Sequence, residues 1–287
     1  MSFSSQKGLV NLRGVNHYYE WVGYSDSFPS KPVMVFLHGW GGSCRYWRSI
    51  AELLAPDYDC LLYDLRGFGR SRENNRVAIG YELEDYAEDL YLLLEAFNLD
   101  KVYLHAHSMG ASIALTFLTI VPERVQKAIL VCNGVYTYNP LTFNLFYRAS
   151  ISVIKSRGQW LLKIPFADRI FMSRFLHKPI PKPMYSCFLE DFLLAEEKAA
   201  INTIFSSVNQ KNVEIMPRRF AQISIPTLMI SGEKDRIIPA SLAKKAVALN
   251  KKNIVYHEIP NTGHFPMLEA PNQYLDVVEN FLNASPS

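Results

Sequence analysis

The sequence of 287 residues lacks the patterns that mark zinc, redox and membrane-spanning proteins. Its four cysteines have no C-x-x-C spacing, which excludes the common zinc and dithiol motifs. No run of about 18 apolar residues is present to cross a bilayer. The beginning of the chain, MSFSSQKGLVNLRG, has no apolar segment of the kind that marks a secretory leader. We therefore expect a cytoplasmic protein without a metal centre.

A strong excess of one charge is also missing. The formal net charge is +3, from 30 basic and 27 acidic residues, which is too small to indicate nucleic acid as a partner. No internal repeat or low-complexity linker interrupts the chain. What is present is a hydrophobic share of 49%, which is ordinary for a globular protein and sufficient for a large buried core.

Short apolar runs recur along the chain, and most of them end at a glycine or a proline. They occupy residues 32–39, 58–67, 101–106, 127–134, 225–232 and 252–260. Near-continuous apolar strands are typical of a parallel sheet that is covered on both faces. Helices are expected between them, at 43–55, 81–97, 109–121, 240–249 and 271–283. This alternation predicts a doubly wound, mostly parallel α/β fold.

One region interrupts the alternation of strands and helices. Residues 137–217 contain no clear strand and have the composition of aromatic-rich helices separated by prolines, the last of which is Pro217. A structureless insertion of this length is uncommon inside a compact domain. We therefore predict a helical cap between two late strands, with residues 1–136 and 218–287 forming the α/β core.

The stretch VYLHAHSMGASIALTF, residues 102–117, places a serine at a sharp turn between a strand and a helix. Ala106 and Gly110 flank Ser108, which is the small-x-Ser-x-Gly context of a nucleophile elbow. Such a turn would expose the Ser108 hydroxyl above the strand end, with the backbone N–H of Met109 facing a developing oxyanion. The alternative is that these small residues only pack a strand against a helix.

A serine nucleophile needs a base, and the base needs an acid that orients it. Asp235 lies in ISGEKDRIIP just after one apolar run, and His264 lies in NTGHFPMLEAP after the last one. The order Ser108, Asp235, His264 is the order expected for a catalytic triad on an α/β sheet. Each residue follows a strand, where open α/β sheets build their sites. Glu233 is the reserve candidate for the acid.

The first apolar run leads into a glycine-rich loop, HGWGG. Glycines let backbone N–H groups converge, and the N–H of Trp40 is the candidate second oxyanion donor. The alternative is a flexible turn that caps a helix at Ser43. We expect His38 to be a structural hydrogen-bonding residue. His105 and His107 flank the serine in sequence and should point away from it, so we expect them to pack or to make supporting contacts.

The motifs LHGWGG, YDLRGFGRS, HAHSMG, GEKDRIIP and NTGHFPMLEAP, in this order, resemble those of the α/β-hydrolase superfamily over residues 10–283. Ala106 departs from the pattern, because it replaces the usual first glycine of the elbow. The resemblance implies an α/β-hydrolase fold, no metal or organic cofactor, and a structural loop held by Asp64 and Arg66. It also implies hydrolysis of an ester, thioester, amide or C–C bond, among which the fold does not choose.

These residues lead us to expect a serine hydrolase that cleaves a carboxylic ester through an acyl-enzyme intermediate. The serine argues against dehalogenase and epoxide hydrolase chemistry, which would use an aspartate nucleophile. Acyl transfer, C–C hydrolysis and cofactor-free perhydrolase or lyase reactions stay open with the same residues. A ligand-binding sensor on this scaffold is the alternative outside catalysis. The aromatic residues of the cap favour a hydrophobic, lipid-like ester as the small-molecule substrate.

Basic charge is concentrated in the cap. Residues 141–189 carry eight basic residues and one acidic residue, Asp168, so this segment has a net charge of +7 and the rest of the chain −4. Bulky apolar residues are interleaved with the charges, as in WLLKIPF and RIFMSRFL. This composition is typical of helices that lie in an anionic membrane interface. Two interpretations stay open: peripheral contact with such a membrane, or an ordinary solvated basic face.

Overall fold

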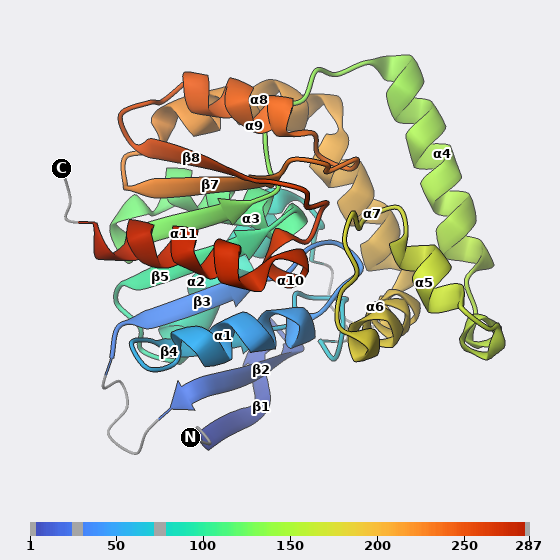
Figure 1. Ribbon diagram of the computed structural model, residues 1–287, viewed down its shortest axis with the longest axis horizontal. Coiled ribbons are helices and arrows are strands. Elements are labelled where there is room, and N and C mark those ends of the chain that lie inside the picture. Colours follow the sequence, from blue (N-terminus) through green and yellow to red (C-terminus); the bar gives the residue numbers. More distant parts are fainter. Residues whose placement is uncertain (1–3, 25–30, 72–78, 285–287) are drawn as a thin grey trace.

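The apolar runs of the sequence form the centre of one sheet (Figure 1). The computed structural model describes residues 4–24, 31–71 and 79–284, and over these residues the sheet has eight strands in the order β1-β2-β4-β3-β5-β6-β7-β8. The parallel strands are β3 (Val33–Leu37), β4 (Asp59–Tyr63), β5 (Val102–His107), β6 (Val125–Val131), β7 (Thr227–Gly232) and β8 (Ile254–Ile259). The predicted mostly parallel α/β sheet is therefore confirmed.

Helices cover both faces of this sheet (Figure 1). One buried core contains side chains from α2 (Leu83–Ala96), α3 (Met109–Ile120) and α9 (Ala240–Ala248). The core on the other face contains side chains from η1 (Cys44–Trp47), α1 (Arg48–Leu54), α10 (Pro266–Glu269) and α11 (Pro271–Asn283). A short helical turn, η2 (Pro122–Arg124), precedes β6. Burial on both faces explains why the parallel strands are almost continuously apolar.

The antiparallel edge of the sheet was missed by the sequence prediction. β1 (Ser4–Leu12) and β2 (Val15–Tyr24) form a hairpin, and β2 pairs antiparallel with β4. The hairpin turns at Arg13 and Gly14, whose φ angles are both positive at 49° and 84°. Positive φ at both positions is the requirement of a type I′ turn, for which asparagine or aspartate is the usual first residue. Arg13 gives no such signal.

Helices fill the segment between β6 and β7, and all of them except the last stand beyond the carboxyl ends of the parallel strands (Figure 1). They are α4 (Pro140–Ser156), η3 (Gln159–Lys163), α5 (Ala167–Met172), α6 (Lys182–Leu194), α7 (Glu197–Val208) and α8 (Gln210–Gln222). The expected cap boundary at residue 217 falls inside α8. Pro217 does not end this helix. Met216 and Phe220 of α8 are buried, because α8 packs on α3 and α9 of the core.

Among the residues that the structure describes, none of the helices has both the length and the apolar character needed to cross a bilayer.

A buried carboxylate joins three separate segments of the core. Arg66, in the loop after β4, is fully buried, and its Nε lies 2.9 Å from Oδ2 of Asp89 in α2. Nη2 of Arg13, in the hairpin turn, lies 2.5 Å from the other oxygen of Asp89. The Asp89 carboxylate therefore ties α2 to both the hairpin and the loop after β4.

We expect Asp89→Ala to lower the free energy of unfolding by about 3 kcal/mol or more, because it removes a carboxylate that compensates a buried guanidinium. Glu88→Ala is the matched control. The Glu88 side chain is adjacent in α2, is 57% exposed and also pairs with Arg13, so its loss should cost about 1 kcal/mol or less. Urea denaturation of both variants measures the difference. Equal losses would contradict the central role of Asp89.

Candidate active site

Ser108 occupies the turn from β5 into α3 in a strained conformation. Its φ of 54° and ψ of −119° lie in a region that residues other than glycine rarely adopt, at a cost of about 1–3 kcal/mol. The backbone N–H of Ser108 donates to Val131 O at 2.8 Å, and Asn133 Nδ2 donates to Ser108 O at 3.2 Å. The end of β6 therefore holds this turn through both backbone polar groups of the serine.

Small residues are needed beside Ser108 because the backbone of α3 approaches the end of β3 closely. A Cβ atom on Gly110 would lie 2.5 Å from His38 O and 2.8 Å from Leu37 O. Ala106 is fully buried in β5, between β3 and β6. The small-x-Ser-x-Gly pattern thus has a steric basis, and alanine is accommodated at its first position.

His264 and Asp235 meet Ser108 at the carboxyl edge of the sheet. His264 Nε2 lies 3.1 Å from Ser108 Oγ, and His264 Nδ1 lies 2.7 Å from Asp235 Oδ2. Ser108 follows β5, Asp235 follows β7 and His264 follows β8. His264 and Asp235 are buried, whereas Ser108 is partly exposed. The structure therefore brings the three residues named from the sequence into one hydrogen-bonded line.

The Asp235 carboxylate is held in its ionised form. Burial raises the pKa of Asp235, but the charge of His264 and hydrogen bonds from His264 and from the N–H groups of Ile237 and Ile238 outweigh burial. The net pKa lies below the ordinary value for aspartate. An ionised carboxylate accepts a hydrogen bond from the Nδ1–H group of His264, which leaves Nε2 as the acceptor that faces Ser108 Oγ.

Glu233, the reserve candidate for the acid, is engaged elsewhere. Its Oε1 lies 2.8 Å from Lys234 Nζ, and its Oε2 accepts a hydrogen bond from the Asn261 N–H at 2.9 Å. The structure thus places Asp235, and not Glu233, against His264.

The glycine-rich loop after β3 passes directly beside Ser108. A Cβ atom on Gly39 would lie 3.2 Å from the Cβ of Ser108. The backbone N–H of Trp40 has no hydrogen-bond acceptor within the described part of the chain. Met109 is the first residue of α3, so its N–H has no intrahelical acceptor. Two backbone donors are therefore available in the segments that flank the Ser108 hydroxyl.

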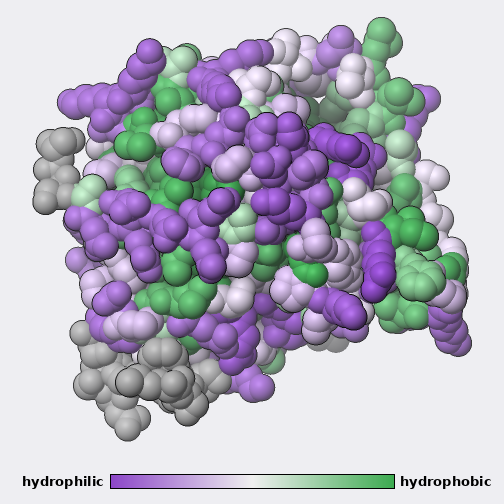
Figure 2. Space-filling model, in the orientation of Figure 1, coloured by the Kyte–Doolittle hydropathy of each residue, from purple (hydrophilic) through white to green (hydrophobic). Residues whose placement is uncertain are grey.

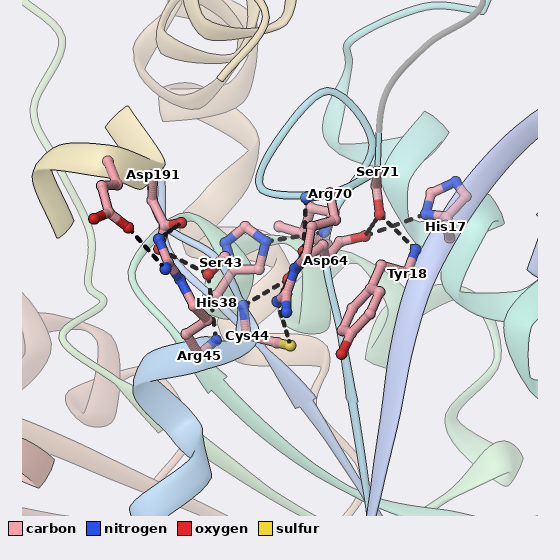
Figure 3. Close-up of polar contacts among 12 residues, drawn as sticks. His17, Tyr18, His38, Ser43, Cys44, Arg45, Asp64, Arg70, Ser71 and Asp191 are labelled. Atoms are coloured by element: carbon pink, nitrogen blue, oxygen red, sulfur yellow. Dashed lines mark hydrogen bonds and ion pairs between the residues drawn. The ribbon is translucent and has the colours of Figure 1, made fainter. Parts of the chain in front are cut away.

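Buried polar groups behind the loop fix its position (Figure 3). Asp64, at the end of β4, accepts hydrogen bonds from the backbone N–H of Cys44 and of Arg70, each at 2.8 Å, and from Arg70 Nε at 2.7 Å. His38 Nε2 accepts from the Leu65 N–H at 2.9 Å. Burial raises the pKa of Asp64, but Arg70 outweighs it, so the pKa is lowered and the carboxylate stays charged.

His107 supports the site from behind, together with a residue that the sequence did not reveal. His107 Nε2 lies 2.8 Å from His264 O, and Nδ1 lies 2.9 Å from the hydroxyl of Tyr46, which accepts the Gly39 N–H. Burial and the charge of His264 both lower the pKa of His107. A neutral His107 therefore links the glycine-rich loop to His264. Nothing in the stretch CRYW distinguishes Tyr46 from an ordinary core tyrosine.

The other flanking histidine, His105, points into the core. Its Nε2 bonds the hydroxyl of Tyr274 in α11, and its ring stacks on Phe36 at a centroid distance of 5.0 Å. Burial lowers the pKa of His105 to about 3. His105 therefore serves packing.

One group of side chains combines ligand types that metals use. Atoms of His107, Cys132 and His264 lie within 4.8 Å of one another. All four ring nitrogens already have hydrogen-bond partners, and burial raises the pKa of the Cys132 thiol. An ion could bind here only by displacing Ser108, Asp235, Tyr46 or the carbonyl oxygen of His264 from these nitrogens. The two imidazole rings and the protonated thiol are therefore arranged for hydrogen bonding and not for metal binding.

The cap contributes aromatic walls near the site. The ring of Phe175 lies 6.2 Å from that of His264, and the ring of Phe192 lies 5.9 Å from that of Trp40, measured between centroids. Phe171 stacks on Phe192 at 5.0 Å. The cap therefore places apolar rings beside His264 and Trp40, the two residues that flank Ser108.

Polar contacts also attach α6 of the cap to the glycine-rich loop (Figure 3). Ser43 Oγ donates to Asp191 Oδ2 at 2.7 Å, and Arg45 bonds both Asp191 and Glu190. Ser43 Oγ also accepts a hydrogen bond from the Arg45 N–H at 3.3 Å, and Ser43 therefore caps η1. The alternative interpretation of this loop, a turn that caps a helix at Ser43, predicted this contact. Loop and cap are thus positioned together.

Comparison with known proteins agrees with this architecture. A family model described as the alpha/beta hydrolase fold matches residues 32–170. An uncharacterised hydrolase of Bacillus subtilis is 26% identical over 272 residues, which cover 94% of this chain and 95% of the relative. A 2-hydroxy-6-oxononadienedioate/2-hydroxy-6-oxononatrienedioate hydrolase of Paraburkholderia xenovorans is 26% identical over 267 residues, covering 90% of this chain and 89% of the relative.

A solved structure has the same fold over almost the whole length. The crystal structure of a putative lipase from Acinetobacter baumannii superposes with a TM-score of 0.79 at 24% identity, covering 97% of this chain and 91% of the other. The family match, the full-length relatives and the order of the strands agree. The chain therefore has the alpha/beta hydrolase fold.

Proposed function

We propose that this protein is a serine hydrolase that cleaves a carboxylic ester of a hydrophobic substrate through an acyl-enzyme intermediate. The observation that carries the proposal is the hydrogen-bonded line from Ser108 through His264 to Asp235 at a strained strand-to-helix turn. A serine in this arrangement has both a base within hydrogen-bond reach and an acid that orients the base.

In the first half-reaction, His264 Nε2 takes the hydroxyl proton of Ser108 while Oγ attacks the acyl carbon of the ester. The carbonyl oxygen becomes an oxyanion, and the N–H groups of Trp40 and Met109 donate hydrogen bonds to it. The tetrahedral intermediate then collapses, and the alcohol leaves with the proton that His264 returns. The acyl group stays bound to Ser108 Oγ as an ester.

The second half-reaction repeats these steps with water. A water molecule gives a proton to His264 Nε2 and attacks the acyl carbon. Ser108 Oγ departs, regains the proton from His264, and the carboxylic acid is released. Asp235 stays ionised throughout, because its role is to orient the imidazole and to stabilise the imidazolium.

The cap supports a hydrophobic substrate. The rings that contact His264 and Trp40 from the cap belong to Phe175 and Phe192. Pockets that bind small molecules are mostly apolar with a few placed polar groups. An ester with a bulky apolar acyl or alcohol part fits this description.

C–C bond hydrolysis is the second candidate function. It is favoured by relatives that carry the name 2-hydroxy-6-oxononadienedioate/2-hydroxy-6-oxononatrienedioate hydrolase and match about nine-tenths of the chain. A dioate substrate carries two carboxylates, which need cationic or hydrogen-bonding partners when they leave water. The aromatic contacts of His264 and Trp40 are a poor match for such a substrate, and we therefore place the ester first.

We expect Ser108→Ala and His264→Ala each to lower kcat for a short p-nitrophenyl ester by about 10⁴-fold or more, because each removes a member of the triad. Ser241→Ala is the matched control, since Ser241 is an exposed serine in α9. Circular dichroism checks that the variants fold. Near-full turnover by the Ser108→Ala variant would show that the serine is not the nucleophile.

The identity of the acid is tested by two isosteric changes. Asp235→Asn should lower kcat by about 10⁴-fold, because the amide oxygen stays on the N–H groups of Ile237 and Ile238 and the amide NH2 then donates to His264 Nδ1, which favours the wrong imidazole tautomer. Glu233→Gln should stay within about twofold, because exposed surface substitutions away from a site have small effects. Steady-state kinetics of both variants with one ester decide the matter. A larger loss for Glu233→Gln would move the acid role to that residue.

A series of p-nitrophenyl esters from acetate to octanoate tests the hydrophobic pocket. We expect kcat/KM to rise by about tenfold or more along the series, because each buried methylene contributes up to about 0.8 kcal/mol. A preference for acetate without any gain toward octanoate would contradict the proposal. Faster turnover of a 2-hydroxy-6-oxo-dienedioate than of every ester would favour the second candidate function.

A further inference from the structure

The outer part of the cap exposes large apolar side chains. Within residues 141–170, six of them are more than half exposed, with values up to 82% at Leu141. They are Leu141, Leu145, Val153, Trp160, Phe166 and Ile170, and we call them the cap face. Figure 2 shows hydrophobic surface along the margin that α4 and α5 occupy in Figure 1. Extended exposed apolar surface of this kind marks an interaction site.

Helix α4 shows why this surface is not simply part of the cap's own packing. Its inner side is already covered, because Phe143 and Tyr147 pack against Phe205 of α7. Leu141 and Leu145 lie one turn apart on the outer side, and Val153 is exposed further along the helix. A helix that is apolar on two sides requires a second apolar environment.

The charges that surround the cap face are not neutralised within the described part of the chain. None of the eight basic residues between 141 and 189 forms an ion pair there, although arginines of the core such as Arg70 and Arg219 are paired with carboxylates. Lys155, Lys163 and Arg169 are exposed and alternate in sequence with members of the cap face. The segment presents a net charge of +7.

A cavity of about 380 Å³ adjoins the cap face. Its lining includes Val153, Trp160 and Ile170 of the cap face, together with Phe171 and Phe192. Phe192 also contacts Trp40, so its ring borders both this cavity and the loop beside Ser108. The volume is within the range of pockets that bind small molecules.

We propose that the cap face docks on an anionic lipid surface and that the adjoining cavity receives one acyl chain of a lipid. The apolar side chains enter the boundary between headgroups and acyl chains, and the basic side chains lie at the lipid phosphates. Delivery of that lipid to Ser108 rests on the proposed function, whereas the docking itself does not. The charge of the cap segment favours an anionic lipid over a second copy of the chain. A second copy of the chain docked through the same face would oppose two segments of +7, whereas an anionic lipid neutralises them.

Vesicle co-sedimentation tests the docking without any turnover. The Ser108→Ala variant is mixed with vesicles of phosphatidylcholine alone, or of phosphatidylcholine with phosphatidylglycerol. We expect binding to the anionic vesicles at low salt, weaker binding to the neutral vesicles, and a loss of about tenfold or more when salt screens the charges. Equal and negligible binding to both kinds of vesicle would overturn the proposal, whatever the catalytic activity of the parent protein.

Charge reversal locates the binding surface. The combined change Lys155→Glu, Lys163→Glu and Arg169→Glu should weaken binding to anionic vesicles by about a hundredfold or more. Lys245→Glu, Lys251→Glu and Lys252→Glu, which are exposed in and after α9, are the matched control with the same change in net charge. Binding that falls equally in both triple variants would reflect only the net charge and would overturn the assignment to the cap face.

The apolar contribution has its own pair of variants. Leu145→Ser with Ile170→Ser should weaken binding to anionic vesicles by about tenfold or more, since buried apolar area drives interfacial insertion. Ile120→Ser with Val255→Ser removes apolar side chains of similar exposure outside the cap and should leave binding unchanged. Circular dichroism checks that both pairs of variants fold. The opposite outcome has two parts: the parent protein forms a dimer that the Leu145→Ser, Ile170→Ser variant does not form, and the parent does not bind vesicles. This outcome would show that the cap face joins two copies of the chain.

Discussion

The close approach of α3 to the end of β3 is the constraint on which the rest of the site depends. The approach is possible because Gly110 has no Cβ, which would otherwise lie 2.5 Å from His38 O. Beside this contact Ser108 has a strained conformation with a φ of 54°, and hydrogen bonds to Val131 and Asn133 hold it there. The same turn starts a helix with a free N–H beside the serine hydroxyl. The close contact at Gly110, the strained backbone of Ser108 and the free N–H donor thus all belong to one short segment.

The parts of the fold and site that could be predicted from sequence are those that follow from local pattern. Apolar runs that end in turns gave the parallel strands, and chain order after successive strands gave Ser108, Asp235 and His264, because parallel strands end at one edge of a sheet. The parts that were missed depend on tertiary contacts or on unusual turn residues. The hairpin turns at Arg13 instead of asparagine or aspartate, and Tyr46 matters only because the fold brings its hydroxyl between Gly39 and His107.

The cap has two sides with different physical requirements. Its inner side packs aromatic rings near His264 and Trp40 and is attached to the glycine-rich loop through Asp191. Its outer side leaves Leu141 and Ile170 in water beside basic side chains that lack ion-pair partners among the described residues. A domain that only covered a site would not need an apolar outer surface. A hydrophobic site, an adjoining apolar cavity and a charged apolar exterior are consistent with an ester that is drawn from a lipid phase.

The central claim is that Ser108 is a nucleophile activated by His264 and Asp235. Its most direct measurement is covalent labelling of the intact protein with a fluorophosphonate, followed by mass spectrometry of the peptides. The account predicts one adduct for each chain, on the peptide that contains Ser108, and slow labelling when His264 is replaced. Absence of an adduct, or an adduct on another serine with equal rate in the His264 variant, would contradict it.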